Sequence, residues 1–205
     1  MVIYYLISAF IGYLLGSLNL AYLLGKSKGF DIREYGSNNA GTSNATITMG
    51  LKAGVLVGLH DILKSCIAVL IVTWLFPNLA GAGAIAGAMA VFGHIFSIFL
   101  DFRGGKGFAP FLGVVLAFDW KFFLALLVII ILVSLITDYI VMGTFTTIIV
   151  FPIYLYLEGV ELNTLIPIVI ASLIIFLKHF ENIKKIFKGE EIGVRSAFSK
   201  KNKIS

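Results

Sequence analysis

The sequence predicts an all-α membrane protein, a seven-transmembrane-helix bundle with some short spans, its N-terminus outside and its C-terminus cytoplasmic. Of the 205 residues, 59% are hydrophobic and only 13% are charged, and the mean hydropathy is +0.99. A soluble domain of this length would need far more charge to cover its surface. The apolar stretches give the number of helices, and the positions of lysine and arginine give the orientation.

The apolar stretches support seven helices, which fall at roughly 2–25, 52–75, 79–100, 107–118, 122–137, 140–157 and 163–177. A helix needs about 20 residues to cross the ~30 Å hydrocarbon core of a bilayer. The stretch 107–118 has Pro110 near its start. It would make only about 18 Å of helix at 1.5 Å per residue. A re-entrant segment is therefore the alternative interpretation of this stretch.

The basic residues favour the seven-helix count, because that count collects them on one side of the membrane. That side receives the basic tail and the loop cations Lys26, Lys28, Arg33, Lys52, Arg103 and Lys106, whereas the other side receives only Lys121. Cytoplasmic loops carry an excess of Lys and Arg. We therefore expect one multi-pass domain over residues 1–205 in the inner membrane, with functional loops facing the cytoplasm and a basic cytoplasmic tail at about 184–205.

The first polar cluster is the stretch 35–44, which is rich in glycine, asparagine and hydroxyl side chains. Its candidate binding residues are Gly36, Ser37, Asn39, Gly41, Thr42 and Asn44. A backbone rich in Gly and Asn can adopt positive φ and turn several N–H groups toward one point. Such a concave set of donors is typical of a phosphate site. The alternative is a polar loop that only connects two membrane helices.

The second cluster contains Arg103, Gly104, Gly105 and Lys106. The two glycines allow the backbone to approach a ligand closely, Lys106 offers a point charge to an anion, and Arg103 offers a bidentate contact. The spacing of a nucleotide-binding P-loop is absent. The alternative is a turn that carries two cations lying along the membrane surface.

The third cluster is the cytoplasmic end of the last helix, where His179 and Asn182 are three residues apart and can point at one ligand. Asp61 and Lys64 have the same spacing inside an apolar helix, and His94 ends another. An ionisable pair inside a membrane helix is costly, so it either orders the bundle or contacts substrate. No Cys, His or carboxylate cluster has metal-ligand spacing, so we expect no metal and no cofactor.

These three clusters, in this order, resemble the three motifs of the bacterial acyl-phosphate:glycerol-3-phosphate acyltransferase family. The resemblance is carried by 36–44, by Gly93-His94 followed by 102–107, and by 178–183, and it extends over essentially the whole chain. It implies transfer of a fatty acyl group from acyl phosphate to the 1-hydroxyl of sn-glycerol 3-phosphate, which yields lysophosphatidic acid and phosphate in phospholipid biosynthesis. The implied partners are these two substrates and membrane lipid, with no nucleic acid, and we expect a monomer.

The resemblance also implies roles for individual residues. The catalytic set would be Ser37, Lys106, His179 and Asn182. The first cluster would hold the acyl-phosphate head, and Gly104, Gly105 and Lys106 would hold glycerol phosphate. His179 and Asn182 would orient the acceptor or the leaving phosphate. The general base is either His179 or a phosphate oxygen of the donor, and we favour the donor oxygen. Asp61, Lys64 and His94 would be supporting residues.

The chain departs from the family pattern at three places. Asn38 replaces a glycine, Ile47 falls where an arginine is common, and Tyr139 is followed by Val141 and Thr144 in place of serines. Arg33, Lys52 and Arg103 are candidates to replace the missing guanidinium. Because Ile47 stands in place of the arginine, the second alternative is that the chain is a divergent paralogue that acylates another phosphorylated alcohol. A small lipid or anion transporter is the third alternative, although the polar residues gather at one membrane face instead of the midplane.

Overall fold

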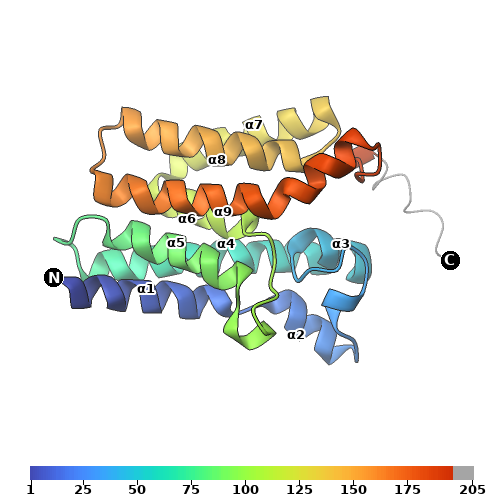
Figure 1. The fold of residues 1–205 in the computed structure, drawn as a ribbon, viewed down its shortest axis with the longest axis horizontal. Coiled ribbons are helices and arrows are strands. Elements are labelled where there is room, and N and C mark those ends of the chain that lie inside the picture. The colour runs from blue at the N-terminus through green and yellow to red at the C-terminus, as the bar shows by residue number, and fades with distance from the viewer. Residues whose placement is uncertain (196–205) are drawn as a thin grey trace.

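The structure, a computed structural model, describes residues 1–195, and every regular element in that range is a helix (Figure 1). The α-helices are α1 (Val2–Ser17), α2 (Leu20–Ser27), α3 (Thr42–Met49), α4 (Leu51–Leu75), α5 (Ala82–Ile95), α6 (Phe108–Phe118), α7 (Trp120–Thr137), α8 (Ile140–Leu157) and α9 (Leu162–Phe187). Two 3₁₀ turns, η1 (Ile32–Glu34) and η2 (Ile98–Leu100), lie in the connections. The predicted all-α class is confirmed for this range, and the last part of the predicted basic tail lies outside it.

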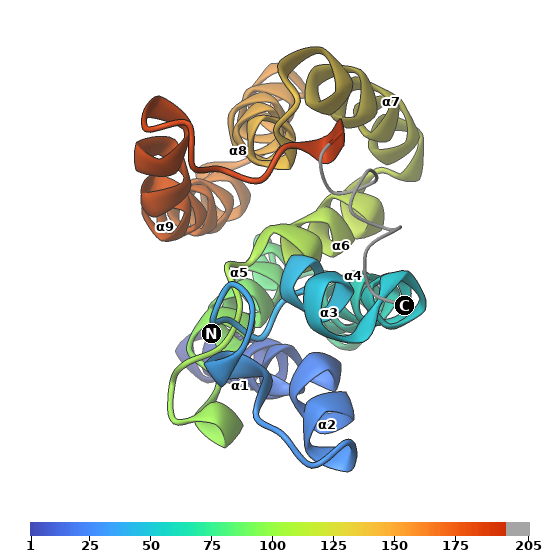
Figure 2. The ribbon, with the colours of Figure 1, turned by 90° about the vertical axis from the view of Figure 1, so that its right-hand side faces the viewer.

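Within residues 1–195, six segments are long and apolar enough to cross a membrane. They are Val2–Ser27, Leu51–Leu75, Ala82–Leu100, Trp120–Thr137, Ile140–Leu157 and Leu162–Phe187. The remaining predicted stretch forms α6, which has 11 residues and is therefore only about 16 Å long. Phe111 and Val114 of α6 are fully buried. The short helix is thus packed inside the bundle, between α1–α5 on one side and α7–α9 on the other (Figure 2).

The first predicted stretch, 2–25, is divided into two helices at Leu18 and Asn19. Asn19 has an extended backbone, and its side-chain oxygen accepts a hydrogen bond from Tyr22 N at 2.9 Å, so that it caps α2. Its side-chain nitrogen donates to Ala40 O at 2.8 Å. The break therefore links the first helix pair to the donor-rich stretch that precedes α3.

Close packing of α1 on α5 depends on small residues. An added Cβ at Gly12 or Gly16 of α1 would collide with the backbone of Ala86 or Ala90 of α5. Small residues at such spacing let helix backbones approach closely in a membrane. This contact fixes the position of α5, the helix that leads into the loop with Gly104, Gly105 and Lys106 (the second loop).

The three polar clusters lie at one end of the bundle. In Figure 1 the connection from α2 to α3, the segment from α5 to α6 and the C-terminal end of α9 lie in the half of the bundle that is farther from the N-terminus. The candidate site is therefore built from loops and helix ends at one surface of the bundle.

Candidate functional site

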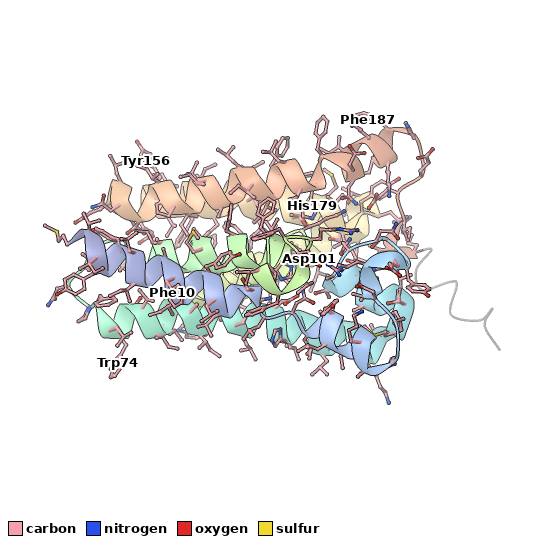
Figure 3. The ribbon with its side chains drawn as sticks, turned by 60° about the horizontal axis from the view of Figure 1, so that its bottom comes forward. Phe10, Trp74, Asp101, Tyr156, His179 and Phe187 are labelled. Carbon is pink, nitrogen blue, oxygen red and sulfur yellow. The ribbon has the colours of Figure 1, made fainter. Side chains whose placement is uncertain are left out.

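A cavity of about 380 Å³ lies where the three polar clusters meet. Its lining comes from three segments: Arg33, Asn38 and Asn39; residues 102–106; and Leu177, Lys178 and Glu181 of α9. Figure 3 places Asp101, the residue just before the second segment, and His179 of α9 at the same level along the bundle. The chain thus brings together groups that are more than 70 residues apart.

Asn44 shapes the first loop, the stretch 35–44 of the first polar cluster, from inside. Its side-chain nitrogen donates to the carbonyl oxygens of Ile32 at 2.8 Å, Tyr35 at 3.0 Å and Asn39 at 2.7 Å, and its oxygen accepts from Ser37 N at 2.7 Å. The side chain is fully buried. We predicted Asn44 as a substrate-binding residue, but its polar atoms are already used by the loop. In this structure Asn44 positions the loop and does not line the cavity.

The loop turns at two residues with positive φ, Gly36 at 62° and Asn38 at 57°. Asparagine is one of the few residues that tolerate this left-handed region. The replacement of the family's glycine by Asn38 is therefore compatible with the same turn. Ser37 is exposed, and its hydroxyl accepts a hydrogen bond from Asn39 Nδ2 at 3.2 Å. Asn39 lines the cavity, and Ser37 lies beside it without lining the cavity itself.

Gly41 and Thr42 form the start of α3, next to the second loop. Gly41 is the residue before the helix, and an added Cβ there would lie 4.0 Å from Gly105 Cα. The Thr42 hydroxyl oxygen is buried and has no hydrogen-bond partner within residues 1–195. It lies against Gly58 of α4, so Thr42 supports α3 in this structure and does not line the cavity.

Arg33 is a cavity residue that we considered only as a possible replacement for the missing arginine. Its guanidinium donates to both Asp31 carboxylate oxygens, at 3.0 and 2.8 Å, and to Leu100 O at 2.6 Å. The Arg33 hydrogen bond holds the pKa of the Asp31 carboxyl at about 2, and Asp31 in turn raises the pKa of Arg33. Arg33 is therefore a permanent cation with a fixed orientation.

The second loop needs glycine at 104 and 105 because α5 leaves no room for side chains. Gly104 N donates to Ile95 O at 3.0 Å and Gly105 N donates to His94 O at 3.1 Å. An added Cβ at Gly104 would collide with His94 O, and one at Gly105 would collide with His94 Nε2. Arg103 follows two residues with positive φ, is exposed, and lines the cavity.

Lys106 connects the second loop to α9. Its ammonium donates to Asn182 Oδ1 at 2.5 Å, and Asn182 Nδ2 donates to Glu191 Oε1 at 2.7 Å. Burial lowers the pKa of Lys106, and the negative charge of Glu191 opposes that effect. The structure thus joins two predicted catalytic residues and adds Glu191, which sequence reasoning missed. The available signal was the acidic pair Glu190 and Glu191 within the basic tail.

His179 is buried beneath the cavity wall. Its exposed fraction is 7%, its Nδ1 lies 2.9 Å from Ile175 O, and its ring meets Phe145 edge-on. Since the carbonyl oxygen can only accept, Nδ1 carries a proton, and Nε2 of the neutral ring is an acceptor. Asn182 contacts Lys106, but His179 is not among the cavity-lining residues. The cavity side of α9 instead presents Lys178 and Glu181.

Comparison with known proteins identifies the family. A family model described as glycerol-3-phosphate acyltransferase matches residues 6–189. The chain belongs to this family. A glycerol-3-phosphate acyltransferase from Thermoanaerobacter pseudethanolicus is 40% identical over 193 residues, which cover 92% of this chain and 94% of that protein. Glycerol-3-phosphate acyltransferase 1 from Oceanobacillus iheyensis is 34% identical over 206 residues, 97% of this chain and 99% of that one.

Two solved structures of PlsY (YgiH), an integral membrane glycerol 3-phosphate acyltransferase, have the same fold as this member of the family. The glycerol 3-phosphate form has a TM-score of 0.86 and 33% identity, and covers 92% of this chain and 94% of that chain. The lysophosphatidic acid form has a TM-score of 0.85 and 31% identity, with 95% and 98% covered. The resemblance inferred from the three motifs is therefore confirmed.

The departures from the acyltransferase family pattern can now be placed. Ile47 is on α3, is 52% exposed and does not line the cavity. Of the three candidate replacements for the arginine, Arg33 and Arg103 line the cavity and Lys52 does not. Thr144, after Tyr139, is buried in α8 and away from the lining. Guanidinium groups at the cavity are thus supplied by the first and second loops.

Proposed function

We propose that this chain transfers a fatty acyl group from acyl phosphate to the 1-hydroxyl of sn-glycerol 3-phosphate and releases inorganic phosphate. The observation that carries the proposal is the cavity, whose lining combines glycine-rich backbone with four cations: Arg33, Arg103, Lys106 and Lys178. Both substrates carry a phosphate, and two phosphates require this density of positive charge and N–H donors. Membership of the acyltransferase family supports the same reaction.

The chemistry suits a site without a strong nucleophile. An acyl phosphate is a mixed anhydride with a good leaving group. The acceptor oxygen attacks the acyl carbon, the bond from that carbon to the bridging phosphate oxygen breaks, and phosphate leaves with the electron pair. The hydroxyl proton passes to a phosphate oxygen of the donor or to a base such as His179. Positioning of the substrates and stabilisation of the leaving phosphate by cations supply the acceleration.

We further propose that the protein crosses the inner membrane seven times as a monomer, with its N-terminus outside and the cavity facing the cytoplasm. The short helix α6 begins after Gly107 of the second loop, and α7 follows it and ends at Asp138, whose carbonyl oxygen accepts a hydrogen bond from Val194 N after α9. This arrangement puts Lys26, Lys28, Arg33, Arg103 and Lys106 on one side and Lys121 on the other, as expected for cytoplasmic loops. The long acyl chain of the donor, which lies in the surrounding lipid, would then have direct access to the bundle.

The test is an activity assay on purified protein in detergent or lipid, given palmitoyl phosphate and glycerol 3-phosphate, with phosphate release as the signal. We expect release that needs both substrates. Lys106→Ala and Ser37→Ala should each reduce it by roughly 10²-fold or more, because each removes a donor to a developing charge. Lys52→Ala is the matched control, since Lys52 is exposed outside the cavity.

Three other results would contradict the proposal, and each points elsewhere. Phosphate release that does not depend on glycerol 3-phosphate, but does depend on another phosphorylated alcohol, indicates the paralogue suggested by Ile47. Release without any acceptor indicates a hydrolase. Binding of phosphorylated lipid without turnover indicates the transporter alternative.

A further inference from the structure

A buried cluster of Asp61, Lys64 and His94 lies directly beneath the second loop. The Lys64 ammonium is 2.8 Å from Asp61 Oδ1, 2.9 Å from His94 Nδ1 and 2.7 Å from Leu18 O. An ammonium group has three N–H donors, so these three acceptors account for all of them. The side chains are only 4%, 1% and 3% exposed for Lys64, Asp61 and His94. The cluster therefore joins α4, α5 and the break between α1 and α2.

This geometry determines which nitrogen of His94 carries the proton. His94 Nδ1 also lies 3.5 Å from Asp61 Oδ1, but the Lys64 ammonium is closer, at 2.9 Å. Because an ammonium group can only donate, the Lys64 contact makes Nδ1 the acceptor and leaves the proton of the neutral ring on Nε2. The Nε2 edge of the ring faces Gly105, because an added Cβ at Gly105 would collide with that atom. His94 thus meets the second loop with its ring and also with its carbonyl oxygen, which accepts from Gly105 N at 3.1 Å.

Stability of the fold alone is a poor explanation for the cluster. Burying two charges is costly, and an apolar pair of similar volume is often as stable or more stable. Asp61 Oδ2 also has no hydrogen-bond partner within residues 1–195, so the carboxylate is incompletely satisfied. What the pair does supply is a fixed donor for one nitrogen of His94.

We propose that Asp61 and Lys64 hold His94 in the Nε2–H tautomer, and that the His94 ring positions the Gly104–Lys106 loop in the cavity. These three residues are positioning residues for Lys106, which in turn contacts Asn182. They act through the loop and not on the reacting atoms. The kinetic consequence rests on the proposed acyl transfer, whereas the tautomer of His94 does not depend on it.

The first experiment is ¹⁵N NMR of protein labelled at histidine. The chain has three histidines, so single His60→Gln, His94→Gln and His179→Gln variants assign the signals. We expect the His94 ring to be neutral and protonated at Nε2, and to become a mixture of tautomers in the Asp61→Asn/Lys64→Met double variant. The double variant avoids leaving one buried charge unpaired. A His94 ring protonated at Nδ1, or one unchanged in the double variant, would overturn the proposal.

The second experiment separates positioning from simple stabilisation. In the double variant and in His94→Phe, the KM for glycerol 3-phosphate should rise by roughly tenfold or more, because a small displacement of a binding group is costly. The KM for acyl phosphate should stay within about twofold. Ser65→Ala is the control, since Ser65 is fully buried on α4 and its hydroxyl has no partner within residues 1–195.

The outcomes distinguish the two proposals. Equal changes in both KM values, or a lower melting temperature with neither KM changed, would mean that the cluster only stabilises the fold. If wild-type protein shows no turnover with glycerol 3-phosphate, the proposed function fails, and the NMR result still decides whether Lys64 fixes the tautomer of His94.

Discussion

At the level of single residues, Lys106 is the cation most sensitive to its surroundings. It is partly buried, contacts Asn182 Oδ1 at 2.5 Å, and has a pKa lowered by burial. Arg33, in contrast, keeps its charge at any accessible pH because Asp31 raises its pKa further. A change of charge at the cavity under alkaline conditions should therefore come from Lys106 before it comes from Arg33.

This difference predicts the pH dependence of substrate binding. Only the protonated ammonium attracts phosphate, so the KM for glycerol 3-phosphate should rise with pH. Because burial lowers the pKa of Lys106, the rise should begin at a lower pH than it would for an ordinary lysine, whose pKa is about 10.4. The substrate phosphate does not contribute, since its second ionisation is complete well above about pH 6. Measurement of the KM for glycerol 3-phosphate between about pH 7 and 10 tests this prediction. In Lys106→Arg the alkaline rise should disappear, and an identical rise in that variant would show that another group is responsible.

At the level of secondary structure elements, the contact between α1 and α5 sets the position of the second loop. Gly12 and Gly16 let the two backbones touch, and α5 ends with His94, whose carbonyl and ring hold Gly105. A residue far from the cavity therefore affects its geometry through one rigid helix.

We predict that Gly12→Leu destabilises the protein by about 1–3 kcal/mol, the usual cost of forcing extra atoms into a packed contact. Phe10→Leu is the matched control on the same helix, because Phe10 is 65% exposed. Thermal unfolding in detergent, followed by circular dichroism, measures the difference. A melting temperature for Gly12→Leu equal to that of Phe10→Leu would show that α1 and α5 tolerate separation.

The elements also show what the sequence could predict and what it could not. Hydropathy located the apolar stretches, since it depends on residues that are neighbours in the chain. It missed the break at Asn19 and the helix α3 inside the polar cluster, because the first depends on a hydrogen bond to Ala40 and the second on packing against Gly54 and Gly58. The motifs predicted Lys106 and Asn182 as residues of one site, and the two side chains are in contact. The buried positions of Asn44 and His179 depend on three-dimensional contacts that the spacing of motifs does not reveal.

At the level of the whole molecule, the direction of α6 decides whether the charges are sorted between the two membrane faces. The helix is too short to span a bilayer by itself, yet Gly107 precedes it at the cavity end and Asp119 caps α7 directly after it. If α6 crosses, Asp101 and Lys121 are on opposite faces. If it is re-entrant, they share one face, and the excess of cations no longer marks a single side.

We predict that α6 crosses. The experiment uses Cys66→Ser as the parent, because Cys66 is the only cysteine in the chain and is 8% exposed. Asp101→Cys and Lys121→Cys then introduce single reporters at two exposed positions, with Lys28→Cys and Asn78→Cys as references for the two ends of the bundle. A membrane-impermeant maleimide applied to intact spheroplasts should label the reporters at 121 and 78, and the same reagent applied to inside-out vesicles should label those at 101 and 28. Labelling of positions 101 and 121 from the same side would show that α6 is re-entrant, and the lysine and arginine distribution would then have to be explained by a six-span topology.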